Sequence, residues 1–308
     1  MRVAVIGGTG FVGSYILDEL IGQSHEPVLL VRPGSEGKVR HKELCTLVTG
    51  EVQDAAAVRR TVSDCAAVIY LVGILREQPG KGITFEEMHY KGAVRAIDLA
   101  AETGAGRFVL MSANGVKPYG TPYQSTKYRA EQHLRGTNLD WTIFRPSVMY
   151  GPPRGRMEFA SQLYDQMIRP PLPAPLFFDG LLPTAAGTFR IAPVHIKDVA
   201  AVVVKSLENP KTYKQTYGLC GPEALEWRDI IRLLARAVGK EKLTVPVPVL
   251  GIKGAAAMLE QFDFFPVTRD QIVMLMEGNT CDSTEVFDLF QITPGRFNAD
   301  SLAYLKDR

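Results

Sequence analysis

The stretch from residue 2 to residue 14 constrains the fold more than any other part of the chain. Residues 3–6 form a short apolar run that is typical of a strand buried in a parallel sheet. From Phe11 onward, apolar residues recur at helical spacing. Between the two lies a glycine-rich join, so the sequence predicts a strand, a tight turn and a helix start. The join reads Gly7-Gly8-Thr9-Gly10-Phe11-Val12-Gly13.

Glycines at this spacing are suited to holding a phosphate against the backbone. They permit a sharp turn, let backbone N–H groups approach a ligand and let the helix pack closely on the sheet. A helix N-terminus also offers unpaired donors and the positive end of its dipole. The alternative is an ordinary glycine turn, but the flanking strand and helix favour a dinucleotide. The residues predicted to bind its pyrophosphate are Gly7, Thr9, Gly10, Phe11, Val12 and Gly13.

The end of the second predicted strand, residues 27–31, distinguishes between two cofactors. A carboxylate there would bind the adenosine ribose 2′-OH, whereas an arginine suits a 2′-phosphate. Arg32 follows this strand, and further basic residues come at positions 38, 40 and 42. The pattern favours NADP(H). NAD(H) is the alternative if these residues are only solvated surface charges.

Strand and helix patterns alternate along the first half of the chain, which is typical of an α/β protein. We therefore predict a Rossmann doubly wound parallel sheet of strand order 3-2-1-4-5-6, followed by a smaller α/β C-terminal lobe. The dinucleotide-binding domain is predicted to comprise residues 1–150 and about 189–206, and the substrate or partner lobe about 151–188 and 207–308. The further predicted strands are 44–49, 67–73, 107–111 and 141–146, and the predicted helices include 54–62, 85–103 and one from Pro122 through Leu134.

The candidate catalytic residues are Tyr123 and Lys127, at the start of the helix that follows Pro122. A spacing of four places both side chains on one helix face. A tyrosine is a poor acid–base group at neutral pH unless a nearby ammonium lowers its pKa, and Lys127 is placed to do so while binding a nicotinamide ribose. The alternative is an exposed helical pair, which is common by chance.

These motifs resemble the short-chain dehydrogenase/reductase superfamily, and the Arg-Pro-Ser-x-x-Tyr-Gly-Pro pattern at 145–152 resembles its extended group. Motifs at 217–223, 246–248, 267–271 and 274–279 narrow the likeness to an atypical branch. The chain resembles bacterial relatives of the nucleotide-binding accessory subunit of respiratory complex I, over nearly its whole length.

The resemblance implies further roles. It places Glu51 and Val52 near the adenine, and Pro146 and Val148 beside the nicotinamide. The predicted fourth strand ends near the adenosine and its phosphates, at Leu71, Val72 and Gly73.

The same resemblance exposes a departure in the expected catalytic set. Ala113 stands where the family places a hydroxyl that donates to the substrate carbonyl. Ser112 is one residue earlier, so in an extended strand it faces the other side. His89 occupies a position where many extended relatives carry Asn, and a lone histidine is more often a packed or surface residue.

Three functions follow as hypotheses. The first is an NADP(H)-dependent oxidoreductase acting on an unknown carbonyl or quinone substrate. The second is a non-catalytic assembly or redox-sensing protein that binds the dinucleotide as a structural ligand. The third is a nucleotide-sugar epimerase or dehydratase, against which Arg32 and Ala113 both argue.

Composition limits the partners and the compartment. A net charge of +2, from 35 basic and 33 acidic residues, gives no reason to expect a nucleic-acid partner. Residues 250–265 are predicted to form an amphipathic helix, with a membrane-surface or membrane-associated partner contact as the alternative. No metal site is expected. The four cysteines are expected to be reduced and the protein cytoplasmic, since no targeting peptide or spanning segment is evident.

Overall fold

The structure is a computed structural model that describes residues 1–180, 182–249 and 268–308. Its contacts divide the chain into two units. The first unit consists of Met1–Pro146, Ile196–Leu219 and Thr284–Ile292, and the second of Ser147–His195, Cys220–Ser283 and Thr293–Arg308. The predicted amphipathic helix at 250–265 lies outside the described residues.

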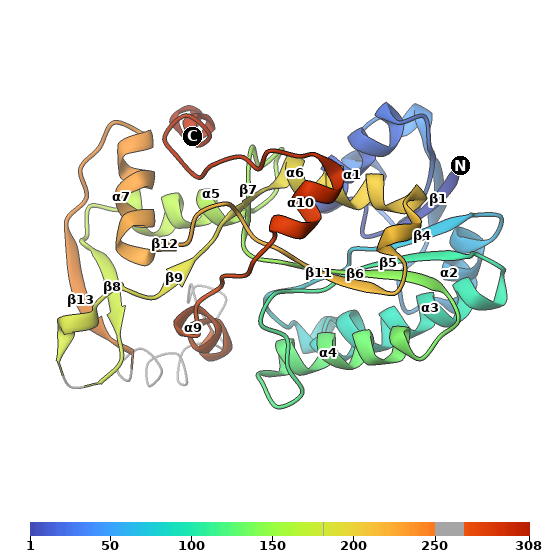
Figure 1. The fold of residues 1–308 in the computed structure, drawn as a ribbon, viewed down its shortest axis with the longest axis horizontal. Helices are drawn as coiled ribbons and strands as arrows, with labels where there is room; N and C mark the ends of the chain where they lie inside the picture. Colours follow the sequence, from blue (N-terminus) through green and yellow to red (C-terminus); the bar gives the residue numbers. More distant parts are fainter. Residues whose placement is uncertain (181, 250–267) are drawn as a thin grey trace. The chain divides into compact units, whose positions relative to one another are not determined.

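The first unit is built on a seven-stranded parallel sheet of order β11-β6-β5-β4-β1-β2-β3 (Figure 1). The predicted order 3-2-1-4-5-6 is confirmed, with one further strand beside β6. The central strands are buried along their whole length, which explains their nearly continuous apolar sequences. The strands are β1 (Arg2–Ile6), β2 (Glu26–Val31), β3 (Thr46–Thr49), β4 (Ala67–Tyr70), β5 (Arg107–Met111), β6 (Asp140–Pro146) and β11 (Gln215–Leu219).

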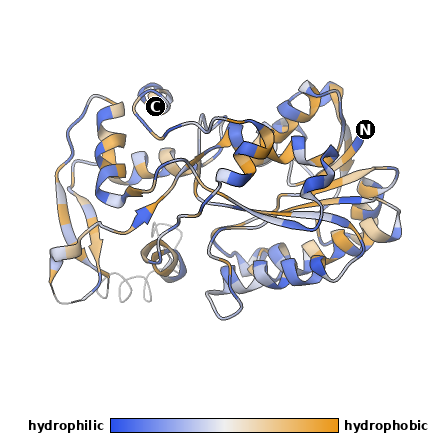
Figure 2. Cartoon of the chain, in the orientation of Figure 1, coloured by the Kyte–Doolittle hydropathy of each residue, from blue (hydrophilic) through white to orange (hydrophobic). Residues whose placement is uncertain are grey.

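Helices cover both faces of this sheet (Figure 1). On one face lie α2 (Ala55–Val62), α3 (Gly92–Glu102) and α4 (Pro122–Arg135), and a π-helical turn, η4 (Glu86–Lys91), leads into α3. On the other face lie α1 (Phe11–Gly22), α6 (Ile196–Lys205) and α10 (Thr284–Phe290). Hydropathy follows this layering, since the strands are apolar and the outer side of α4 is polar (Figure 2).

The predicted domain boundaries differ from this division at the C-terminal side. Residues 207–219 belong to the first unit because β11 pairs with β6 and because Arg107 ties them to β5. The Arg107 guanidinium donates to the Ser206 carbonyl at 3.0 Å and lies 3.1 Å from the Thr212 hydroxyl. Residues 284–292 join the first unit through α10, which packs on α6, whereas residues 189–195 fall in the second. Such long-range pairings have no local sequence pattern.

Within its described residues, the second unit combines three two-stranded sheets with short helices around a core that includes Trp227. The segment 169–187 is rich in Pro and Gly, yet it contains the strand Ala174–Phe178. Pro175 is tolerated there because a two-stranded sheet leaves one edge of each strand free. The pairs are β7 (Met149–Tyr150) with β10 (Val194–His195), β9 (Arg190–Ile191) with β12 (Leu225–Glu226), and β8 (Ala174–Phe178) with β13 (Thr244–Pro248); the helices are α5 (Phe159–Leu163), η5 (Tyr164–Ile168), α7 (Trp227–Ala237) and α9 (Arg269–Met276).

One prediction about the cysteines was wrong. Cys220 and Cys281 form a disulfide in the second unit, with Cα atoms 5.6 Å apart. Their separation of 61 residues hides the pairing in the sequence, and the fold brings the two segments together through the Cys220 N–H, which donates to Ser283 Oγ at 2.7 Å. Cys45 and Cys65 are free thiols, as expected. The disulfide removes one of the observations on which the cytoplasmic prediction depended.

Candidate functional site

The glycine turn between β1 and α1 has the close packing that its sequence predicts. Gly7 has φ +99°, and a Cβ at Gly13 would lie 2.5 Å from the Gly7 carbonyl oxygen. That distance is a steric overlap with backbone, so only glycine fits at position 13. Gly10 precedes α1 with extended backbone, and no side chain caps the helix. The turn is thus a backbone cradle at a helix N-terminus, which is suited to an anion.

The start of α4 is fixed by a capping box. The Gln124 N–H donates to Thr121 Oγ1 at 3.3 Å, and the Thr121 N–H donates to Gln124 Oε1 at 2.8 Å. Pro122 occupies the first helical turn, where its missing N–H costs no hydrogen bond. This local chemistry positions Tyr123 and Lys127 one helical turn apart on the same face.

Lys127 is buried beside the ends of β4 and β5. Its side chain donates to the Met111 carbonyl at 3.2 Å, and a Cβ at Gly73 would lie 3.7 Å from Lys127 Nζ. The residue is 7% exposed, and burial lowers the pKa of Lys127 to about 8, partly opposed by Glu131. The ammonium therefore lies at the carboxyl edge of the sheet, next to a predicted cofactor contact.

The expected lowering of the Tyr123 pKa by Lys127 is not found. Lys127 Nζ lies 5.7 Å from the centre of the Tyr123 ring and donates to the Met111 carbonyl, and Lys127 does not lower the pKa of Tyr123. Burial instead raises the pKa of Tyr123 to about 12. Tyr123 is therefore a neutral phenol at pH 7 and a weaker acid than an ordinary tyrosine.

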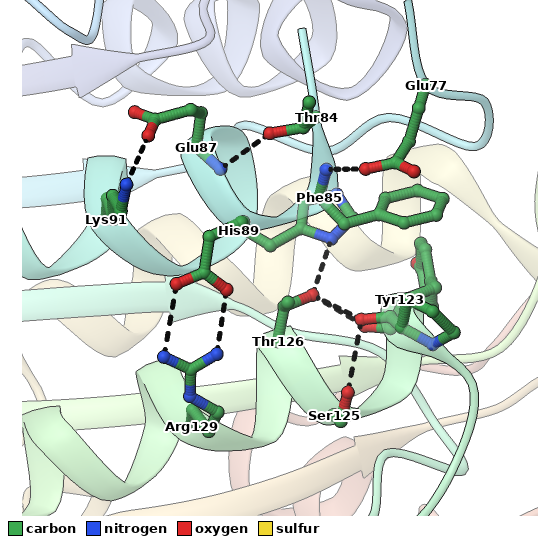
Figure 3. A network of polar contacts seen from close by, with 12 residues as sticks. Glu77, Thr84, Phe85, Glu87, His89, Lys91, Tyr123, Ser125, Thr126 and Arg129 are labelled. Atoms are coloured by element: carbon green, nitrogen blue, oxygen red, sulfur yellow. Dashed lines mark hydrogen bonds and ion pairs between the residues drawn. The ribbon is translucent and has the colours of Figure 1, made fainter. Parts of the chain in front are cut away.

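The Tyr123 ring lies against an aromatic cluster that sequence reasoning missed. His89 is 5.0 Å and Phe85 5.8 Å from it, centroid to centroid, both edge to face. His89 Nε2 accepts from the Ile74 N–H at 3.0 Å. Its Nδ1 lies 3.4 Å from Thr126 Oγ1 (Figure 3). Burial, then Lys127, lowers the pKa of His89 to about 2. A neutral His89 thus links the chain after β4 to α4, as its helical spacing from Phe85 could have suggested.

Ser112 does not take the place of the missing hydroxyl at Ala113. Its Oγ donates to Glu131 Oε1 at 2.6 Å, and Glu131 is fully buried. Arg145 from β6 donates to both oxygens of that carboxylate, with 2.9 Å between Nε and Oε1. The Ser112 hydroxyl is therefore held by Glu131 in the interior of the first unit.

Comparison with known proteins identifies the family. The family described as NAD(P)H-binding matches residues 7–167, more than half of the chain. The chain belongs to this NAD(P)H-binding family. It is an extended, atypical member of the short-chain dehydrogenase/reductases, as its motifs indicated.

Three relatives illustrate the range of this NAD(P)H-binding group. The 40 kDa subunit of mitochondrial NADH-ubiquinone oxidoreductase from Neurospora crassa is 25% identical over 276 residues, covering 87% of this chain and 68% of the subunit. Ceramide reductase from Caulobacter vibrioides is 26% identical over 259 residues, covering 84% of this chain and 77% of the reductase. The structure of UDP-glucose 4-epimerase from Thermus thermophilus with NAD has a TM-score of 0.74 at 18% identity, covering 100% of this chain and 98% of that chain, and shows the shared fold.

In this NAD(P)H-binding protein, several predicted contacts lie around the carboxyl edge of the sheet. Arg32 directly follows β2, is exposed and makes no ion pair with any described residue. Glu51 is exposed after β3, and the Val52 carbonyl accepts from Arg95 Nη1 at 2.7 Å. The Leu71 N–H donates to the Ile6 carbonyl at 2.8 Å, which places Leu71, Val72 and Gly73 beside the glycine turn.

The two remaining predicted contacts fall in different units of the NAD(P)H-binding chain. Pro146 ends β6 in the first unit, and its carbonyl accepts from the Asn114 N–H at 2.9 Å. Val148 lies in the second unit, where its carbonyl accepts from the Val194 N–H at 3.0 Å. Within the described residues, no cluster of side chains suits a metal ion, and no helix has the length and apolarity to cross a bilayer.

Proposed function

We propose that this protein is an NADP(H)-dependent oxidoreductase that reduces a carbonyl or quinone substrate. The observation that carries the proposal is the placement of Lys127 and Tyr123 at the edge of the sheet where β4 ends. Bound NADPH would supply the hydride. The glycine turn from Gly7 to Gly13 would hold its pyrophosphate, since it leaves room only for backbone at the helix N-terminus.

In this proposal Tyr123 donates the proton. The phenol is protonated at pH 7 and can give its proton to a carbonyl oxygen as hydride arrives, although its raised pKa makes it a weaker acid than an ordinary tyrosine. Lys127 binds a hydroxyl of the nicotinamide ribose with the donors that the Met111 carbonyl leaves free. Glu51 and Val52, Leu71 to Gly73, and Pro146 and Val148 retain their proposed contacts with the adenosine and nicotinamide ends.

The preference for NADP(H) over NAD(H) is part of the proposal. It is supported by Arg32, an exposed guanidinium after β2 that makes no ion pair with any described residue. By contrast, Arg40 pairs with Asp18 at 3.3 Å. We expect Arg32→Glu to weaken NADPH binding about 10-fold or more and to affect NADH much less, measured by isothermal titration calorimetry.

A second candidate is a protein of an assembly or a redox sensor that uses the dinucleotide as a structural ligand. It is favoured by Ala113 and by the engagement of Ser112 with Glu131, which together leave the carbonyl without its usual second donor. Loss of one such donor typically lowers a rate about 100- to 1000-fold. The complex I subunit of Neurospora crassa supports this candidate, and the ceramide reductase supports the first.

Binding is tested first, with two glycines of α1. We expect Gly13→Ala to abolish NADPH binding, because its Cβ would overlap the Gly7 carbonyl. Gly22→Ala should leave binding unchanged, since a Cβ there meets nothing within 4 Å. Calorimetry that finds neither NADPH nor NADH bound to the wild-type chain would refute both candidate functions.

Turnover then separates the two candidates. NADPH oxidation is followed at 340 nm with a panel of ketones, aldehydes, quinones and ceramide-type ketones. An oxidoreductase should lose activity in Tyr123→Phe and keep it in Tyr119→Phe, because Tyr119 is 97% exposed. Tight NADPH binding that raises the melting temperature, without turnover of any substrate, would favour the structural role.

A further inference from the structure

The second unit carries a pocket of about 310 Å³ that none of the proposed functions uses. It lies where two segments distant in sequence run side by side, the one before β8 and the one before β13 (Figure 1). The Ala174 N–H donates to the Leu243 carbonyl at 2.8 Å, which fixes the two segments to each other. The lining residues are Ile168, Arg169, Pro170, Pro171, Leu172, Lys240, Glu241, Lys242 and Leu243.

Large apolar side chains project into solvent at this point. Leu172 is 72% exposed and Leu243 is 79% exposed. Val245 is 43% exposed and lies in the strand that begins just after Leu243. Single exposed leucines are ordinary, but two at one pocket form a contiguous apolar feature.

Cations surround the apolar side chains. Arg169, Lys240 and Lys242 line the pocket, against the single carboxylate of Glu241. Lys242 is held in place because its Nζ donates to the carbonyls of Ile168 and Pro170. The Arg169 side chain is 68% exposed, and its ion pair with Asp165 is long, at 3.9 Å. The Arg169 guanidinium therefore remains accessible to an outside anion.

We propose that these residues form a surface that docks on an anionic lipid bilayer. We call it the basic leucine patch and define it as Arg169, Leu172, Lys240, Lys242, Leu243 and Val245. Leucines that enter the acyl boundary, flanked by cations that meet anionic headgroups, are the combination that holds a protein at a membrane interface. The net positive rim favours an anionic partner.

A bilayer fits this patch better than a folded protein does. A stable protein interface needs roughly 800 Å² from each partner, with a complementary shape. The basic leucine patch instead presents a few side chains at two adjacent chain segments, which suits shallow insertion into a fluid surface. The inference is independent of the proposed reaction, because the patch residues belong to the second unit, whereas the glycine turn and Lys127 belong to the first.

The test is co-sedimentation of the full chain with lipid vesicles. We expect binding to vesicles of phosphatidylglycerol and phosphatidylcholine, weakening as salt is added, and little binding to pure phosphatidylcholine. The double variant Leu172→Asn with Leu243→Asn should weaken binding at least 10-fold, because the favourable free energy of transferring each leucine side chain from water to the acyl region is lost. Lys240→Glu should weaken it at least fivefold.

Matched variants away from the patch serve as controls. Leu44→Asn changes a leucine that is 54% exposed, and Arg60→Glu reverses an exposed cation of the first unit. Both should bind vesicles like the wild type, and all variants should keep the wild-type melting temperature. The proposal is overturned if wild type ignores anionic vesicles, if the patch variants bind equally well, or if the patch instead mediates a dimer in sedimentation velocity without lipid.

Discussion

Helix α4 buries two opposite charges one turn apart, and their surroundings differ sharply. Glu131 is fully buried, and its carboxylate accepts from Ser112 at 2.6 Å and from Arg145, with Arg135 at 3.3 Å. Lys127 is 7% exposed and makes one hydrogen bond with the residues that the structure describes, to the Met111 carbonyl. The anion is almost fully satisfied, whereas the cation retains donors for another group.

This difference separates a residue that stabilises the fold from one that is available to a ligand. Buried charges persist in proteins when partners compensate the loss of hydration, as they do for Glu131. Lys127 is only partly compensated, and burial lowers its pKa to about 8. Strongly shifted groups with spare hydrogen-bonding capacity are concentrated at functional sites, which agrees with the role proposed for Lys127.

The largest expected effect comes from removing Glu131. Glu131→Ala leaves Arg145 half-buried without its carboxylate and Ser112 without an acceptor, so we expect the free energy of unfolding to fall by about 3–5 kcal/mol. The free energy of unfolding is measured by urea denaturation, with circular dichroism as the signal. Glu102→Ala is the control, since its pair with Arg59 is exposed and should cost under about 1 kcal/mol. Similar losses in both variants would mean that Glu131 is not a structural charge.

Lys127 should act on stability in the opposite direction. Its pKa falls from 10.5 when unfolded to about 8 when folded, so the folded state disfavours the proton. The free energy of unfolding attributable to Lys127 should therefore rise as pH increases from about 8 to 10.5, by roughly 3 kcal/mol. Lys127→Met should lack this rise, so the difference between the two denaturation curves isolates it. Parallel pH profiles for wild type and variant would contradict the shift.

His89 provides a smaller test on the element that packs against α4. The pKa of His89 falls from 6.5 in the unfolded state to about 2 in the folded state. As the pH is lowered, His89 is therefore protonated in the unfolded state while it stays neutral in the folded state. The contribution of His89 to the free energy of unfolding is thus fully present above pH 6.5. Between pH 6.5 and pH 5 the free energy of unfolding should fall by about 2 kcal/mol. In His89→Gln this part of the pH dependence should vanish, after normalising to the variant's stability at pH 7. An unchanged slope would show that His89 is accessible to protons.

The sequence was sufficient for the sheet and for the glycine turn, because both depend on local patterns. Apolar runs locate the strands, and the spacing of Gly7, Gly10 and Gly13 is a backbone requirement that no distant residue alters. The carboxyl edge of the sheet then follows from the parallel order, and with it the expected neighbours of the turn. Strand β11 was not assigned to the sheet, because its pairing with β6 joins segments far apart in the chain.

The chemistry around α4 was predicted less well. Tyr123 and Lys127 were found by spacing, but their pKa values depend on burial and on where the Lys127 ammonium is directed. Glu131 was missed although it continues the same helical face four residues after Lys127. Its role could be recognised only once Arg145, on the next strand, was seen to meet it. The disulfide between Cys220 and Cys281 was not predicted either, because the two cysteines are far apart in the sequence and only the fold brings them into contact.

The smallest effect is expected from a third charged residue of α4, which lies on its outer side. The Arg129 guanidinium donates to both oxygens of Glu86, at 2.7 Å and 3.2 Å, the two dashed lines drawn from Arg129 in Figure 3. It also stacks 3.7 Å from the centre of the Tyr90 ring. Arg129 is 46% and Glu86 41% exposed, so water and salt screen the pair despite its two-point geometry.

A double-mutant cycle with Arg129→Ala and Glu86→Ala measures this coupling directly. We expect less than about 1 kcal/mol at low salt and nearly none in 1 M salt, where the screening length is about 3 Å. The equivalent cycle for Glu131 and Arg145 should give a larger coupling that changes little with salt, because the carboxylate is buried. If the outer pair were as strong and as salt-resistant as the inner one, two-point geometry rather than burial would govern the charges of α4. The contrast between Lys127 and Glu131 would then have to be explained by hydrogen-bond number alone.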